Sequence, residues 1–336
     1  MHHRTLGGGH GPRISAVCLG TRRFGTTVDE ATAFAILDRF AEAGGTFVDT
    51  ANPCGCRVPG ATGDESELLL GRWLRSRRAA GRTVVATTAG ARPAPARGGR
   101  WPAHTEGLGA VAVRAAIEGS LRRLGTDRVD LYYAPSFAHH YVHTEDRGVP
   151  PEETVTALAG LVRDGTVAVL GAANHRTWRL AEARLLAAGR GLPGFRAVQQ
   201  RYTYLRPRRG LPPEHQVETD EELLDYVAAH PGLTLLARGT LMGGAYARPD
   251  RPPPERYDHP GSVARLRVLA EVAAECGATV NQVVLAWLMG GPQPVVPVLG
   301  VTGCGPSWTS AWRPWTSRWT RCRGLGWIRR EGWGGA

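Results

Sequence analysis

Asp49, Cys54 and Cys56 lie close together after a short apolar run, and their side chains could support acid–base or metal chemistry. A thiol has a pKa of about 8.5 and can donate a proton, so Cys54 is a candidate acid beside the carboxylate of Asp49. Sulfur and imidazole ligands also suit zinc or copper, so Cys54, Cys56 and the histidine-rich segment 139–143 could instead form a metal site. Neither spacing matches a zinc finger. The simpler interpretation is an ordinary loop with solvated histidines.

The basic residues limit both the chemistry and the partners of the chain. The sequence contains no lysine, so the protein cannot use a mechanism that depends on a lysine ammonium group. The formal charge of +11 suggests nucleic acid, but residues 302–336 alone carry six arginines against one glutamate. Elsewhere arginines alternate with acids along helical stretches, as on a solvated surface. We therefore expect no nucleic-acid binding.

The composition is that of a soluble globular protein. The chain has 336 residues, of which 42% are hydrophobic and 21% charged, enough to bury one large core. No apolar run reaches the ~18 residues that a membrane-spanning helix needs, so we expect no membrane association. The N-terminus lacks the apolar core of a signal peptide, which favours a cytoplasmic location.

Eight short apolar, β-branched runs alternate with longer helical patterns. The runs are residues 16–21, 46–50, 83–88, 129–134, 167–174, 197–202, 233–238 and 295–300. Alternating strands and helices build a parallel sheet, and eight such units close a barrel. We therefore predict an α/β fold, a (β/α)8 TIM barrel, with the candidate site on loops at the C-terminal face of the barrel.

Several helix ends are marked by residues with known capping preferences. The Thr-x-x-Glu spacing of a capping box occurs at Thr27/Glu30, Thr62/Glu65 and Thr219/Glu222. Pro151 suits the first position of a helix, where no amide partner is needed. Gly125 follows an apolar helical pattern and predicts a left-handed stop.

The two ends of the chain differ from the repeating units. Residues 4–15 are glycine-rich and predict a β-hairpin that plugs the lower end of the barrel, so we assign residues 1–301 to the barrel. Residues 302–336 hold six of the ten tryptophans without a helical or strand period. A one-base frameshift of an amphipathic helix in a GC-rich gene gives such a sequence, so we predict an irregular tail. A Trp/Arg surface for membranes or nucleic acid is the alternative.

Several motifs together resemble the aldo-keto reductases over residues 3–301. They are Leu19-Gly-Thr21, Thr46-Phe-Val-Asp-Thr-Ala51, Glu65-Ser-Glu67, Val129-Asp-Leu-Tyr132, Gly171-Ala-Ala-Asn174 and Gln282-Val-Val-Leu-Ala-Trp287. The resemblance implies a (β/α)8 barrel that binds NADP(H) across the C-terminal ends of its strands. It also implies reduction of a small-molecule carbonyl substrate, an aldehyde or ketone, by hydride transfer.

Members of that family protonate the substrate oxygen with a tyrosine, whose pKa is lowered by a lysine that an aspartate holds. A histidine orients the carbonyl. By this resemblance Asp49 is the aspartate, but Cys54 stands at the tyrosine position and Thr88 at the lysine position. Pro135 stands at the histidine position, and His143 is a candidate for the displaced histidine after an eight-residue insertion. A phenol of pKa about 10 is a slow acid without a nearby cation, so we expect activity to be weak or lost.

The cofactor positions implied by the resemblance are only partly retained. Asn174 and Gln199 match the side chains that bind the nicotinamide carboxamide. The ring-stacking aromatic is replaced in the segment Arg238–Leu241, and Gly300 and Thr302 lie near the phosphate position. The helix that would receive the phosphates on its N-terminus falls in the irregular tail. We therefore expect weak binding of NADP(H).

Three functional hypotheses follow. The first is an NADP(H)-dependent aldo-keto reductase with weak or lost activity. The second is a non-catalytic pseudoenzyme that binds cofactor or a partner protein. The third is a metal site built from Cys54, Cys56 and residues 139–143. The sequence alone does not define the substrate or the oligomeric state.

Overall fold

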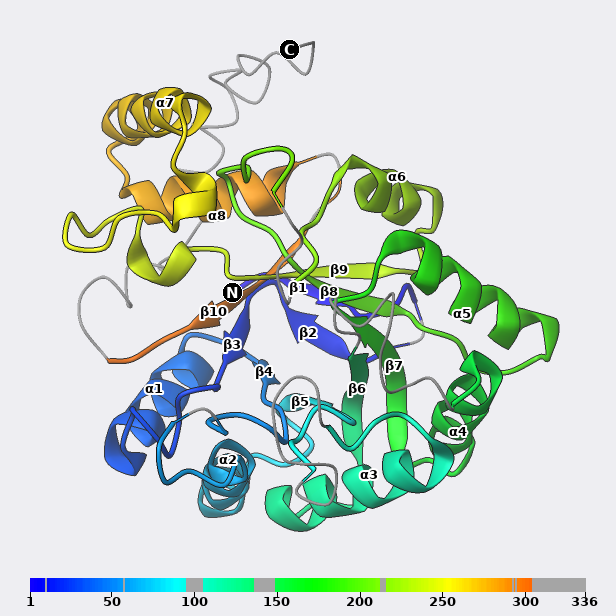
Figure 1. Cartoon of the computed structure of the whole chain (residues 1–336). Coiled ribbons are helices and arrows are strands. Elements are labelled where there is room, and N and C mark those ends of the chain that lie inside the picture. Colours follow the sequence, from blue (N-terminus) through cyan, green and yellow to red (C-terminus); the bar gives the residue numbers. More distant parts are fainter. Residues whose placement is uncertain are drawn as a thin grey trace.

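Eight parallel strands close into a barrel in the computed structural model of the chain (Figure 1). The structure describes residues 1–9, 11–56, 58–94, 105–135, 149–211, 216–291, 293 and 295–303. The strands are β3 Cys18–Gly20, β4 Phe47–Asp49, β5 Val84–Thr88, β6 Val129–Pro135, β7 Val167–Ala173, β8 Ala197–Arg201, β9 Thr234–Arg238 and β10 Val296–Gly300. Their order around the barrel follows the chain, and β10 closes the ring by pairing with β3. The predicted (β/α)8 barrel is confirmed, because each apolar run of the sequence coincides with one strand.

Helices cover the outside of the barrel between successive strands (Figure 1). They are α1 Glu30–Glu42, α2 Glu65–Ser76, α3 Ala110–Leu124, α4 Pro151–Arg163, α5 Thr177–Gly189, α6 Glu221–Ala229, α7 Pro260–Cys276 and α8 Val280–Gly290. Within the described ranges, no single helix is long and apolar enough to cross a membrane. The pair α7 and α8 meets that test together, but it is bent by 98°.

The N-terminal hairpin plugs one end of the barrel, as predicted. Its strands β1 His3–Thr5 and β2 Arg13–Ser15 pair antiparallel. Ile14 is fully buried among the side chains of the barrel interior. The Gly7 amide donates to Thr234 Oγ1 at the start of β9, so the hairpin lies at the amino ends of the strands. Of the predicted tail, only residues 302 and 303 lie among the described residues.

The helix caps correct part of the sequence-based prediction. α1 is capped by Asp29, whose carboxylate accepts from Thr32 N at 2.9 Å, and not by Thr27. α6 is capped by Asp220 and not by Thr219. In both cases an aspartate closer to the first helical turn supplies the capping oxygen. Gly125 does end α3 in the left-handed conformation, as predicted.

The barrel interior has an apolar layer and, toward the C-terminal ends of the strands, a polar layer. The apolar layer includes the fully buried residues Phe47, Ala86, Ala197 and Leu236. Side chains two residues apart on a strand share a face, so the next inward-facing positions are polar. These positions are Asp49, Thr88, Gln199 and Arg238, which we call the mouth layer. The mouth layer contains three of the predicted site residues, Asp49, Gln199 and Arg238.

Candidate functional site

Asp49 lies at the end of β4 and is held across the barrel by an amide. Gln199 Nε2, on β8, donates a hydrogen bond to Asp49 Oδ1 at 3.1 Å. The strands β4 and β8 lie four places apart in the closed order, so these residues reach each other from opposite walls. Thr88 follows on the neighbouring strand β5 and brings no charge to Asp49. The position expected to carry a cation therefore contributes none, and a neutral donor takes its place.

Removal from water changes the acidity of Asp49. The pKa of its carboxyl is raised to about 7, chiefly because burial disfavours the charged form. The hydrogen bond from Gln199 and the positive charge of Arg238 partly oppose this rise. Near neutral pH, Asp49 is thus a mixture of carboxylate and carboxylic acid. It can take up or release a proton in that range.

Cys54 lies in the loop after β4 and is buried. Burial raises the pKa of its thiol to about 12, and the negative charges of Asp49 and Glu67 add to the rise, whereas Arg22 lowers it. The thiol therefore keeps its proton at neutral pH and is a weaker acid than a free cysteine. Its surroundings favour an inert role over that of a replacement acid.

The histidine and metal hypotheses fall largely on residues outside the described ranges. Pro135, at the histidine position, is the buried last residue of β6. His143 and the rest of residues 139–143 lie outside the described residues. Among the described residues, no group of three His, Cys, Asp or Glu side chains could hold a metal ion. The displaced histidine and the metal site remain predictions.

Tyr133 is a residue of the site that the sequence did not single out. Its side chain is fully buried in the barrel interior, and a Cβ atom added to Gly171 would lie 2.6 Å from its Cδ1. Burial raises the pKa of the Tyr133 phenol well above its ordinary value, and Asp49 raises it further. Gln199 is near enough to favour the phenolate slightly but makes no well-formed hydrogen bond to the hydroxyl. Strand alternation along β6 would have placed this tyrosine inside the barrel.

The two carboxamide-binding candidates are engaged inside the protein. Asn174 follows β7 in a left-handed conformation with φ 64°. Its Oδ1 accepts from Val217 N at 2.6 Å and from Arg238 Nη2 at 3.2 Å. The Gln199 amide nitrogen is used by Asp49. A nicotinamide carboxamide would have to replace these internal partners.

Arg238, which we expect at the position of the ring-stacking aromatic, faces other positive charges. Its pKa is lowered to about 10, chiefly by burial and then by Arg201 and Arg22. Leu241, further along the same segment, packs against the main core. On the neighbouring strand, Gly300 ends β10 and Thr302 follows it, and both are exposed. The structure therefore brings Asp49, Gln199, Asn174 and Arg238 together, whereas Gly300 and Thr302 are exposed to solvent at the end of β10.

A fully buried acid, Glu67, lies near the mouth on α2. Glu67 is fully buried, accepts from Thr87 Oγ1 at 2.6 Å and pairs with Arg123 Nε at 2.6 Å. Arg123 also reaches Asp64 at 3.2 Å. This buried cluster ties α2 to α3 and to β5, the strand that ends at Thr88.

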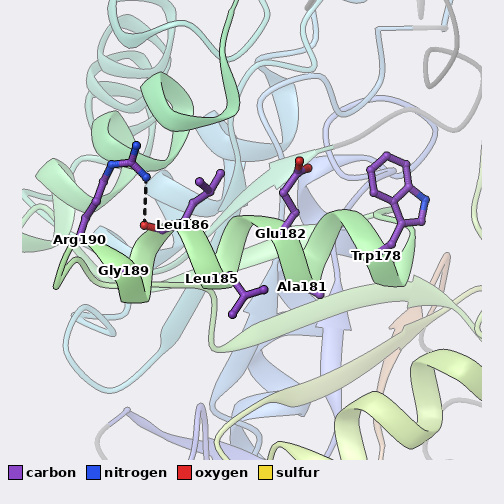
Figure 2. Close-up of a pocket in the computed structure, with 7 residues that line it drawn as sticks. All are labelled: Trp178, Ala181, Glu182, Leu185, Leu186, Gly189 and Arg190. Atoms are coloured by element: carbon purple, nitrogen blue, oxygen red, sulfur yellow. Dashed lines mark hydrogen bonds between the residues drawn. The ribbon is translucent and has the colours of Figure 1, made fainter.

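A pocket on the outer surface lies away from this chemistry. Figure 2 shows it along α5, where Trp178, Leu185 and Arg190 are among the lining residues. Arg190 Nη1 donates to Leu186 O within the same segment. The lining is mostly apolar and contributes nothing to the mouth layer.

Comparison with known proteins identifies the family. The model described as the aldo/keto reductase family matches residues 16–304. Uncharacterized oxidoreductase YrpG of Bacillus subtilis is 31% identical over 306 residues, covering 86% of this chain and 84% of YrpG. Norsolorinic acid reductase stcV of Emericella nidulans is 30% identical, covering 89% and 74%. Aryl-alcohol dehydrogenase GME11368 of Pestalotiopsis microspora is 28% identical, covering 89% and 74%. This chain belongs to the aldo/keto reductase family.

Proposed function

We propose that this chain is an NADP(H)-dependent reductase of an aldehyde or ketone whose turnover is weak. The observation that carries the proposal is the state of Asp49, which Gln199 holds at 3.1 Å in place of a lysine. The sequence contains no lysine, and none of the described residues at this point of the site supplies an ammonium group to activate an acid for the carbonyl oxygen. The family membership supports the reaction type.

The available proton donors support slow chemistry. When bound, the reduced nicotinamide supplies the hydride. The carbonyl oxygen then needs a proton from a group whose pKa is near the working pH. The thiol of Cys54, with a pKa of about 12, holds its proton too firmly. Asp49, with a pKa of about 7, is better matched in acidity, but it is bonded to Gln199.

Turnover of an aryl aldehyde with NADPH tests this proposal. The aryl-alcohol dehydrogenase among the relatives suggests this choice of substrate. We expect Cys54→Tyr and Thr88→Lys together to raise kcat/KM by about 10²-fold or more, since a positioned acid is worth about 10²–10⁴. Each change alone should do little, because the two groups act as a unit. Cys56→Ala is the matched control at a neighbouring cysteine. A parent protein as fast as the double variant, with Cys54→Ala harmless, would contradict the proposal.

We also propose that NADP(H) binds weakly and that the oxidised form binds less well than the reduced form. Binding must break the internal hydrogen bonds of Asn174 and Gln199, each worth about 0.5–1.5 kcal/mol. The cation of Arg238 would lie beside the nicotinamide and repel its oxidised, positively charged form. Calorimetry with both forms tests this. A micromolar or tighter Kd for NADP⁺ would overturn it.

The alternative function is a non-catalytic, cofactor-binding pseudoenzyme. It is favoured by the Cys54 thiol, whose pKa of about 12 leaves it a poor proton donor at neutral pH. The two experiments separate the alternatives. Measurable NADPH binding without turnover, and no gain in the double variant, would favour the pseudoenzyme.

A further inference from the structure

The outer face of α5 carries an exposed apolar strip. Trp178 is 50% exposed and Leu185 is 73% exposed, and both lie on this helix. Together with Glu182 and Gly189 they follow the i, i+4, i+7, i+11 spacing that places side chains on one face of a helix. We call these four residues the α5 strip. They are among the residues that line the pocket in Figure 2.

No other helix in the described part of the chain has two exposed large apolar side chains. The remaining exposed ones occur singly, on different segments, and are Met1, Leu68, Val111, Leu211 and Val263. Single apolar residues are normal on a protein surface, whereas a contiguous apolar surface marks a contact with another molecule. Among the described surfaces, the α5 strip is therefore the one most suited to a partner.

The charges beside the strip favour a second copy of this chain as the occupant. Glu182 lies near the middle of α5, where it forms a partly exposed ion pair with Arg179 at 2.8 Å. Arg190 follows the last residue of the helix and is exposed, and among the described residues no carboxylate lies within ion-pair distance of it. A parallel pair of α5 helices would place equal charges opposite each other. An antiparallel pair instead places Glu182 of each copy near Arg190 of the other.

The sizes of the residues along the strip also match an antiparallel pair. A two-fold axis midway between Glu182 and Leu185 places Trp178 of one copy opposite Gly189 of the other. A Cβ atom added at Gly189 would have no neighbour within 4 Å, so this end of the strip has room for an indole ring. Helical side chains lean toward the N-terminus of their own helix, so in this pairing Glu182 and Arg190 of the other copy lean toward each other.

We propose that two copies of this chain associate through the α5 strip, with their α5 helices antiparallel. Trp178 packs over Gly189 of the other copy, and the Glu182–Arg190 pair forms twice. Since α5 covers the outside of the barrel (Figure 1), the contact lies away from the mouth layer and does not depend on the proposed reductase function. A helix of 13 residues is only about 20 Å long, so the contact is small and we expect a Kd of about 10–100 µM.

Sedimentation equilibrium of the full chain tests the association. Between about 1 and 300 µM, the mean mass should rise from that of a monomer toward that of a dimer. Leu185→Asp should weaken association at least about 10-fold, because it places a second carboxylate opposite Glu182 of the other copy. Val263→Asp is the matched control, since Val263 is also exposed and apolar but lies on α7, and it should have no effect.

Two outcomes would overturn the association through α5. One is a protein that stays monomeric over the whole concentration range, whatever other molecule binds the strip. The other is a dimer that Leu185→Asp leaves intact. Should Leu185→Asp fail to fold, Gly189→Phe takes its place, because the new ring meets nothing in its own chain but occupies the space of Trp178 from the other copy.

Charge reversal tests the antiparallel arrangement. Glu182→Arg and Arg190→Glu, each alone, place like charges in contact across the dimer and should weaken association about 10-fold. The double variant recreates the pair with its charges exchanged and should restore most of the affinity. Within one chain the two residues lie more than two helical turns apart, so restoration requires that they meet across the contact. Single reversals without effect, or a double variant as weak as the single ones, would refute the antiparallel pair.

Discussion

Two acids near the barrel mouth differ in their burial and in their bonding partners. Glu67 is fully buried between the hydroxyl of Thr87 and the guanidinium of Arg123. Asp49 is held by the neutral amide of Gln199, and its pKa is raised to about 7. A carboxylate in a close ion pair stays charged, whereas a largely desolvated carboxylate without an ion pair titrates near neutral pH. The absence of lysine from the sequence thus affects Asp49 and leaves Glu67 untouched.

The largest expected effect on stability follows from removing Arg123, the cation that pairs with Glu67. We expect Arg123→Met to lower the free energy of unfolding by about 3–5 kcal/mol, because Glu67 is left charged and buried. Urea denaturation measures it. Arg72→Met is the control, since Arg72 and Glu30 form an exposed pair with side chains 44% and 48% accessible. It should cost less than about 1 kcal/mol. Equal losses in the two variants would mean that burial does not distinguish these ion pairs.

A smaller effect on the free energy of unfolding, of opposite sign, is expected at Asp49, which has no ion-pair partner among the described residues. Between its ordinary pKa of about 4 and the folded value of about 7, the native state holds a proton that the unfolded chain has lost. Stability from Asp49 is therefore greatest at low pH and is lost as the pH rises through 7. Asp49→Asn removes this dependence. We expect it to be more stable than the parent by about 2 kcal/mol at about pH 8 and equal to it at about pH 4.

Unfolding curves at several pH values test that expectation. Asp38→Asn is the control of opposite sign, because Arg77 pairs with Asp38 and lowers the pKa of its carboxyl. That variant should lose stability near neutral pH. A destabilised Asp49→Asn at about pH 8 would show that Asp49 has a cationic partner in solution.

The smallest effect concerns the neutral donor. Gln199→Leu removes the hydrogen bond to Asp49 and should lower the free energy of unfolding by about 1 kcal/mol at about pH 8. The loss should be smaller at low pH, because the protonated carboxyl depends less on this donor. It should also move the titration of Asp49 to higher pH. Gln200→Leu is the matched control, since Gln200 donates to the uncharged carbonyl of His175. Its loss should not vary with pH, and identical pH profiles for the two variants would refute the special role of Gln199.

The barrel could be predicted from the sequence because its signals are local and repeated. Eight apolar runs gave the strands, and the glycine-rich start gave the hairpin. The helix caps were harder to predict from the sequence, because Asp29 and Asp220 compete with the nearby threonines for the same backbone amides. Short-range spacing does not decide between two capping residues one or two positions apart.

The candidate site could be predicted only in its parts. Matching motifs located Asp49, Asn174, Gln199 and Arg238, but not the bonds among them. Gln199 reaches Asp49 across the barrel, over 150 positions in the sequence, and no local pattern encodes that contact. Tyr133 was missed because its importance depends on Gly171, a residue on the next strand that leaves room for the ring.

The bond between Asp49 and Gln199 also has a mechanical consequence. Ladder hydrogen bonds join neighbouring walls of the barrel, whereas this bond braces walls that face each other. A ligand that recruits the Gln199 amide must release the brace as it arrives. The mouth is therefore more rigid while this hydrogen bond is present. Once Gln199 binds a ligand instead, the diameter of the mouth can change more freely. Many binding sites behave in the opposite way and become more rigid when the ligand binds.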